Sequence, residues 1–224
     1  MTVIRELKNG VRVAMERMEH VRSVSIGIWV NTGSVRESEG EGGASHFIEH
    51  MAFKGTASRS AEQIASEMDA VGGSLNAFTS KECTCFYAKV LDEHLPIAID
   101  VLSDITFHST FPADELEREK HVILEEILMT EDSPEDLTAE RANALFFQEE
   151  PLARPILGTR ESVLAFDRDR LLAYRREHYT PRNIVVACAG HFDEETLMRL
   201  VEEKLNLEPS ERYALPLAQR YPGG

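Results

Sequence analysis

The stretch His46-Phe-Ile-Glu-His50-Met-Ala-Phe-Lys-Gly-Thr56 decides how the rest of this sequence is interpreted. Its two histidines are four residues apart, and since an α-helix has 3.6 residues per turn, both imidazoles lie on one face, about 6 Å apart along the axis. One small cation can bind both rings at that spacing. Glu49 emerges near the same face, where it reaches a water molecule on the cation without being a ligand itself. The stretch therefore predicts half of a metal site, and the alternative is two ordinary polar residues on a surface helix.

Length and composition are those of a globular protein with a sizeable core. The chain has 224 residues, of which 42% are hydrophobic and 28% are charged, which allows one large domain or two small ones. A formal net charge of −15 argues against nucleic-acid binding, because phosphates would be repelled. The same charge is compatible with substrates that carry lysine or arginine.

The sequence gives no sign of export or of a membrane anchor. No apolar run approaches the length of a membrane span, and the first residues enter a strand pattern directly, without a signal-peptide pattern. Three cysteines are too few for a disulfide framework. We therefore expect a reducing, cytoplasmic setting and no membrane partner.

Strands dominate the first ninety residues. The sequence predicts strands over 3–7 and 11–15, joined through Asn9-Gly10 as a two-residue hairpin, and a half-buried strand over 24–30. A glycine- and glutamate-rich loop over 31–43 leads into the helix of His46. Ser60 and Gln63 form a capping box for a helix that ends near Gly72, and strands follow over 74–79 and 83–90.

Helices fill the middle of the chain. We expect helices over 92–108 and 112–129, the first capped by Asp92, and a third after Ser133. An irregular segment over 158–166 precedes a helix that Asp167 caps, then a strand over 184–189 and a helix that Asp193 caps. This order predicts an α+β fold, with a mostly antiparallel sheet and helices packed on one face.

The last residues have a different character from the rest. Residues 208–224 contain three prolines and end in Gly-Gly, and they show no periodic pattern. We therefore expect residues 1–207 to form the domain that holds the metal site and residues 208–224 to be a linker, not a core element.

A catalytic zinc ion normally has three protein ligands and a water molecule, so a third ligand must come from elsewhere. The helix after Pro112 offers Glu119, His121, Glu125 and Glu126. Glu126 projects from an apolar stripe with Val122, Ile123 and Met129, whereas Glu125 lies on a polar face with Arg118 and His121. A carboxylate on an inward stripe is costly to bury unless it is paired or binds a metal. Glu126 is therefore the predicted third ligand.

Glu119 precedes Glu126 by two helical turns and shares its stripe. It is placed to accept a hydrogen bond from a ligand histidine or to help position the catalytic water. The alternative is a salt bridge between Glu119 and a lysine or arginine.

Four segments together resemble the pitrilysin family of inverted zinc peptidases, and within it the branch of mitochondrial processing peptidase and its bacterial relatives. The motif H-x-x-E-H over 46–50 is the signature of this class. The other segments are 76–88, 119–126 and 178–184, so the likeness covers nearly the whole chain. Glu126 follows His50 by 76 residues, which is the interval of that branch.

The resemblance implies a zinc-dependent endopeptidase with one Zn²⁺ per chain. Its ligands would be His46, His50 and Glu126, with Glu49 as general base and Glu119 as a supporting glutamate. The resemblance also implies that an edge strand pairs with an extended peptide or unfolded polypeptide substrate. The residues of that strand are Asn76, Ala77 and Phe78, and the alternatives are a strand-end hydrogen-bonding role for Asn76 and a core role for Phe78.

Active members of this family pair such a domain with a second one of similar fold, which nothing in 224 residues supplies. We expect the missing half to be a second homologous domain or a partner subunit, with a homodimer as one form of the latter. The chain alone should bind zinc but hydrolyse peptides feebly. Acidic residues that could attract basic peptides are Glu37, Glu39, Glu41, Glu131 and Asp132, although most of them are better explained as solvated loop residues.

Two rival functions follow from the same residues. An S-ribosylhomocysteine lyase-like metal enzyme also carries H-x-x-E-H, but its third ligand is a cysteine, here Cys83, Cys85 or Cys188. A non-catalytic scaffold subunit of the same fold would typically have lost its ligands.

Overall fold

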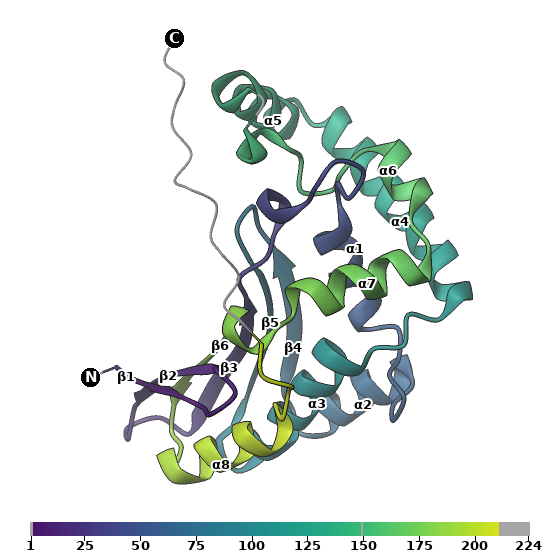
Figure 1. The fold of residues 1–224 in the computed structure, drawn as a ribbon. Coiled ribbons are helices and arrows are strands. Elements are labelled where there is room, and N and C mark those ends of the chain that lie inside the picture. Colours follow the sequence, from purple (N-terminus) through teal and green to yellow (C-terminus); the bar gives the residue numbers. More distant parts are fainter. Residues whose placement is uncertain (1, 149, 211–224) are drawn as a thin grey trace.

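A six-stranded sheet forms the centre of the computed structural model, which describes residues 2–148 and 150–210 (Figure 1). The strand order is β1-β2-β6-β3-β5-β4. Only the β2–β6 pair is parallel, and the other four pairs are antiparallel. The predicted α+β fold with a mostly antiparallel sheet is thus confirmed. The strands are β1 (Val3–Glu6), β2 (Arg12–Arg17), β3 (Ser23–Val30), β4 (Ser74–Thr79), β5 (Thr84–Leu91) and β6 (Ile184–Gly190).

The β1–β2 hairpin was predicted, but its turn differs from the expected two-residue type. The Leu7 N–H donates to Val11 O at 2.8 Å, and the Gly10 N–H donates to Leu7 O at 2.9 Å. Three residues, 8–10, therefore connect the paired ends. Gly10 has φ +100°, the left-handed conformation that such three-residue loops require at one position.

The helices gather on one side of the sheet, with α5 at the end farthest from α8 (Figure 1). This arrangement agrees with the predicted packing on one face. The α-helices in the described residues are α1 (Ala44–Ala52), α2 (Ala61–Ala70), α3 (Leu95–His108), α4 (Ala113–Asp132), α5 (Pro134–Phe147), α6 (Arg160–Ala165), α7 (Arg168–His178) and α8 (Glu194–Lys204). Short 3₁₀ turns cover Ser34–Arg36, Asp92–His94, Pro151–Ala153 and Pro181–Asn183.

The core lies between the sheet and these helices. Alternate residues of β3 turn into it and are almost fully buried, which follows from the two-residue period of a strand. Helix α1 contributes Phe47, Ile48 and Met51, each at most 1% exposed. Helix α1 also contacts β4, β5, α4 and α7. The histidine-bearing helix is therefore held from several sides.

Most of the predicted helix starts are correct. Ser60 and Gln63 form the capping box of α2, and Ser133, Asp167 and Asp193 cap α5, α7 and α8 through their side chains. These caps are local, so sequence alone finds them.

Two helix predictions were wrong. Asp92 does not cap α3, because its carboxylate accepts hydrogen bonds from Arg22 and His191 at a 3₁₀ turn that precedes the helix. Residues 158–166 are not all irregular, since Thr159 caps the short helix α6 through a capping box with Ser162.

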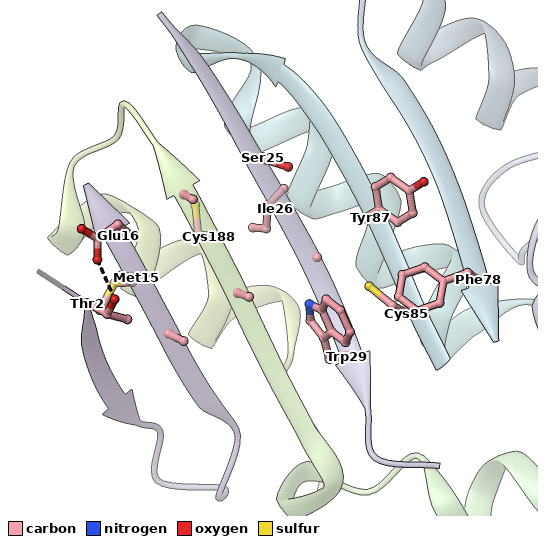
Figure 2. Close-up of a pocket in the computed structure, with 14 residues that line it drawn as sticks. Thr2, Met15, Glu16, Ser25, Ile26, Trp29, Phe78, Cys85, Tyr87 and Cys188 are labelled. Atoms are coloured by element: carbon pink, nitrogen blue, oxygen red, sulfur yellow. Dashed lines mark hydrogen bonds between the residues drawn. The ribbon is translucent and has the colours of Figure 1, made fainter. Parts of the chain in front are cut away.

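The other face of the sheet carries none of the helices in the described residues and forms a shallow apolar pocket of about 420 Å³ (Figure 2). Trp29 and Phe78 meet edge to face, with ring centroids 5.5 Å apart, and Tyr87 lies beside Phe78. Small residues of β2, β3 and β6 line the rest of it. Phe78 is 38% exposed, so it belongs to this open face and not to the core.

The predicted boundary at residue 207 falls just after the last packed element. Leu205, which follows α8, is 1% exposed. Residues 211–224, most of the predicted linker, lie outside the described residues. The division into a domain and a linker stays a prediction.

Candidate metal centre and active site

Helix α1 carries the two histidines and Glu49, and its first turn is fixed by a buried carboxylate. Glu37 is 1% exposed. It accepts the Gly43 N–H at 2.8 Å and the Ser45 N–H at 2.9 Å, which are donors without partners inside the helix. Gly43 has φ +88°, and a Cβ there would lie 2.6 Å from Leu157 O. The helix can therefore begin here only with glycine and an acceptor in place.

Burial raises the pKa of Glu37 to about 7, and the hydrogen bonds from Ser45 and Gly43 oppose that rise. The side chain points into the protein, at the start of α1. Glu37 is thus neither part of an open acidic surface that attracts basic peptides nor a solvated loop residue, so both sequence interpretations were wrong for this residue. Its contacts give it a structural role instead.

The two imidazoles converge on Glu126 of α4. The ring centroids of His46 and His50 are 4.5 Å apart, closer than the 6 Å axial spacing because the side chains lean together. Each Nε2 lies 3.6 Å from Glu126 Oε2. One ligand atom from each residue can be chosen so that all three lie within 4.8 Å of one another. Two helices that are far apart in sequence, α1 and α4, therefore bring three donor atoms to one point.

The donor set suits a zinc ion. Glu126 Oε2 is itself buried and accepts no hydrogen bond from the described residues, which is costly unless a cation binds it. Burial and the neighbouring His50 lower the pKa of His46 to about 3, so this ring is neutral and keeps a lone pair for a metal. Two imidazoles and one carboxylate are a common ligand set of catalytic zinc.

The apolar stripe used to choose Glu126 is only partly inward. Ile123 is 1% exposed, but Val122 is 43% and Met129 is 71% exposed. The Glu126 side chain is 38% exposed, so it stands at the border between core and solvent. Glu125 is exposed as predicted. The border position leaves the site open to a substrate.

Glu119 contacts a predicted ligand directly. Its Oε2 lies 2.8 Å from His50 Nδ1, and since a carboxylate only accepts, Nδ1–H is the donor. This bond fixes the tautomer that leaves Nε2 free to face His46 and Glu126. Lys54 Nζ lies 2.6 Å from Glu119 Oε1. The two roles weighed for Glu119 are therefore both present, a histidine contact and a salt bridge.

Glu49 lies beside the cluster and is held by the end of β4. Thr79 Oγ1 donates a hydrogen bond to Glu49 Oε2 at 2.5 Å. Burial raises the pKa of Glu49, and the Thr79 hydrogen bond opposes this. A carboxylate whose pKa is raised toward neutrality is a better proton acceptor, as a general base requires.

A cleft of about 490 Å³ adjoins these groups. Its walls come from β4 on one side and α5 on the other, and His46 and Glu49 line it. The β4 strand is at the edge of the sheet. The cleft therefore offers an extended chain a free strand edge beside the cluster.

The three predicted substrate-binding residues do not face the same way. In β4, Ala77 and Thr79 point toward the helices, and Asn76 and Phe78 point to the opposite face, since side chains alternate along a strand. Phe78, at the sheet edge, lines the cleft as well as the pocket on the other face. Asn76 Oδ1 accepts the Ala77 N–H at 2.8 Å. The Asn76 side chain thus serves its own strand here, and substrate binding by β4 stays a prediction.

Sequence reasoning missed two residues of this region, Lys54 and Thr79, and it missed the structural role of Glu37. The alternation of β4 would have placed Thr79 on the helix side with Ala77. Lys54 follows His50 by four residues, which hinted at a shared side. Glu37 had no signal beyond its place in the loop before α1.

The cysteines lie away from the ligand cluster. Cys85 and Cys188 line the pocket on the other face of the sheet (Figure 2). Burial raises the pKa of each of these two thiols to about 12, which disfavours the thiolate that a metal needs. The one His/Cys/Asp/Glu group found among the described residues contains no cysteine.

Comparison with known proteins matches the sequence to two models of one peptidase family, which together cover most of its length. The family described as "Insulinase (Peptidase family M16)" matches residues 12–160, and "Peptidase M16 inactive domain" matches residues 165–222. The zinc protease YmxG of Bacillus subtilis, described as uncharacterized, is 49% identical over 84% of this chain and 46% of its own. The zinc protease Rv2782c of Mycobacterium tuberculosis, likewise uncharacterized, is 46% identical over 88% of this chain and 45% of its own.

A solved structure shows the same fold. A protease from Helicobacter pylori superposes with a TM-score of 0.89 at 21% identity, over 99% of this chain and 54% of that chain. The chain thus spans about half the length of the relatives that it matches. Among the described residues, no helix is both long and apolar enough to cross a membrane.

Proposed function

Because the chain belongs to peptidase family M16, the insulinase family, we propose that it is the catalytic half of a zinc-dependent endopeptidase. The observation that carries the proposal is the convergence of His46, His50 and Glu126 within 4.8 Å, with Glu49 beside them. The 76-residue interval between His50 and Glu126 supports the narrower assignment to the branch of mitochondrial processing peptidase.

His46, His50 and Glu126 would hold one zinc ion per chain. When bound, zinc supplies Lewis-acid chemistry, because it polarises a peptide carbonyl and brings the pKa of water toward about 7. Glu49 accepts a proton from the attacking water and delivers it to the leaving amine. Glu119 holds His50 in the tautomer and orientation that a metal ligand needs.

The substrate would be an extended peptide or an unfolded polypeptide segment. A peptide laid along the free edge of β4 forms main-chain hydrogen bonds of the β-sheet type, and the neighbouring cleft receives its side chains. Asn76, Ala77 and Phe78 are the residues of this edge. Main-chain pairing selects for an extended conformation more than for a sequence.

A second half would complete the enzyme. The relatives are about twice as long as this chain, and the Glu126 side of the cluster is open to solvent. We propose that a second domain of the same protein covers the open side of the cluster. We prefer this arrangement to a separate partner subunit or a homodimer. We also propose a cytoplasmic location, which rests on three free cysteines.

The test compares Glu49→Gln with Glu125→Gln in the full-length protein that contains this chain. Glu125 is an exposed carboxylate next to Glu126, so its variant has the same charge change without touching the cleft. We expect Glu49→Gln to keep one zinc ion per chain and to lose about 100-fold or more in kcat on an unstructured peptide. Glu125→Gln should match the wild type.

Peptide cleavage by Glu49→Gln at the wild-type rate would refute the assigned base. A scaffold function would be indicated by a wild-type protein that holds no zinc. Metal that survives Glu126→Ala would indicate a different third ligand.

A further inference from the structure

The end of strand β4 is bonded to the proposed general base. Thr79, the last residue of β4, donates from Oγ1 to Glu49 Oε2 at 2.5 Å across a separation of 30 residues. In the part of the chain that the structure describes, Thr79 is the only hydrogen-bond donor to the Glu49 carboxylate. The strand and the helix of the active site therefore meet at this pair.

We propose that Thr79 is a positioning residue for Glu49, and that through it the strand that binds substrate also orients the base. The inference rests on the proposed peptidase function. It adds Thr79 to the proposed active site, and it makes the orientation of the Glu49 carboxylate depend on the conformation of the edge strand β4.

The hydrogen bond gives the two carboxylate oxygens of Glu49 different roles. Oε2 is occupied by the Thr79 hydroxyl, so Oε1 is the oxygen left to accept a proton from water. A free glutamate rotates about its terminal torsion over a broad range. Tying one oxygen removes that freedom before the substrate arrives, and a fixed base needs no reorganisation in the transition state.

Thr79 is itself held firmly. It pairs with Thr84 of β5, which is fully buried and donates from Oγ1 to Thr32 O at 2.9 Å. The chain then turns back at once, since the Ser80 N–H donates to Cys83 O at 2.8 Å. The hydroxyl of Thr79 thus projects from a strand end anchored to the centre of the sheet.

The coupling to substrate follows from the position of β4. Ala77 and Thr79 share the face toward α1, and both line the cleft together with Glu49 and His46. A peptide that pairs with the free edge of β4 contacts the same strand that fixes the base. Correct pairing therefore places the scissile bond and the base in one rigid frame.

Two substitutions at Thr79 separate the hydrogen bond from the packing. Thr79→Val keeps the shape of the side chain and removes the donor, and Thr79→Ser keeps the donor and removes a methyl group. In the zinc-loaded full-length protein, we expect Thr79→Val to lower kcat by about 10-fold or more, with KM within twofold and zinc content unchanged. Thr79→Ser should stay within about threefold of the wild-type kcat.

Glu49→Gln serves as the reference for a double-variant cycle. If Thr79 acts through Glu49, the double variant Thr79→Val/Glu49→Gln should be no slower than Glu49→Gln alone. A further loss of kcat in the double variant would overturn the proposal, because Thr79 would then act elsewhere.

Two other results would also overturn it. One is a wild-type kcat for Thr79→Val, and the other is equal losses for Thr79→Val and Thr79→Ser, which indicate a packing role. Each leaves the peptidase function standing as long as Glu49→Gln is inactive. An active Glu49→Gln would instead refute the proposed function itself.

Discussion

Replacing Glu119 by alanine should weaken zinc binding without unfolding the protein. Glu119 accepts a hydrogen bond from His50 Nδ1 at 2.8 Å and pairs with Lys54 Nζ at 2.6 Å, and its side chain is 6% exposed. The substitution removes the group that fixes the His50 ring and its tautomer. His50 would then have to be ordered by the metal itself, which lowers the affinity.

The size of the effect follows from these contacts. Removing a partner that orients a ligand histidine typically costs about 10- to 100-fold in metal affinity, or about 1.4 to 2.7 kcal/mol. Glu119→Gln keeps an acceptor oxygen but loses its charge. Since charge-assisted hydrogen bonds are about twice as strong as neutral ones, this variant should lose about three- to tenfold.

Glu117 provides a matched control on the same helix. Its side chain is 68% exposed and pairs with Lys120 at 2.7 Å, so Glu117→Ala removes the same charge two residues away from Glu119. Only the Glu117 end of this pair is exposed, since the Lys120 side chain is 11% exposed, and we expect the substitution to cost about 1 kcal/mol of stability. We expect Glu117→Ala to bind zinc within about twofold of the wild type.

Competition with a chromogenic chelator at fixed ionic strength measures the zinc affinity of each variant. Far-UV circular dichroism and thermal unfolding show whether the fold is intact. The reasoning is refuted if folded Glu119→Ala binds zinc within twofold of the wild type. It is equally refuted if Glu117→Ala weakens binding as much, because the effect would then be one of net charge.

Four further predictions concern the ligands and the start of α1. Glu126→Ala should abolish tight zinc binding, whereas Glu125→Ala should leave it unchanged, as equilibrium dialysis with metal analysis will show. Gly43→Ala should lower the free energy of unfolding, measured by denaturant titration, by about 2 kcal/mol or more, because it adds a backbone clash to the strain of a left-handed conformation. Gly72 is the control, since it has φ +63° but no atom within 4 Å of an added Cβ. Gly72→Ala should cost only about 1 kcal/mol. Burial raises the pKa of Glu37 from 4.5 to about 7, so the folded protein holds a proton there that the unfolded chain has released. The free energy of unfolding, measured by denaturant titration, should therefore fall by up to about 3 kcal/mol relative to Glu37→Gln as the pH rises from about 5 to about 8. Removal of zinc by a chelator should lower the melting temperature but leave the far-UV spectrum unchanged.

The metal cluster was accessible from sequence because its parts follow helical periodicity. If residues 46–50 are helical, His46 and His50 must lie on the same face of the helix. The same helical geometry distinguished Glu126 from Glu125 as the candidate ligand. The apolar stripe was a weak reason for choosing Glu126, since its members Val122 and Met129 are exposed. Glu126 stands at the border of the core, where an orphaned carboxylate oxygen marks it better than hydrophobic neighbours do.

The contacts that hold the site in place were not accessible in the same way. Thr79 and Glu49, like Glu37 and Ser45, are joined by tertiary packing that no local period encodes. Alternation in β4 predicts the face of Thr79 but not the helix that faces it. Secondary-structure patterns therefore found the three residues that cluster, and only the packed sheet and helices reveal what positions them.

Helix α1 is fixed at each end and in its middle before any metal is considered. Glu37 holds its first turn, Thr79 holds Glu49, and Glu119 of α4 contacts both His50 and Lys54 just beyond the last turn. Helices α1 and α4 are thus joined by protein contacts in addition to the proposed metal ligands, unlike the helices of small zinc domains that fold only on binding metal. We therefore expect the fold not to depend on metal binding alone. In the proposed peptidase, a peptide laid on β4 would meet a base that Thr79 already holds, and a second half would serve to cover the cleft and not to build the metal centre.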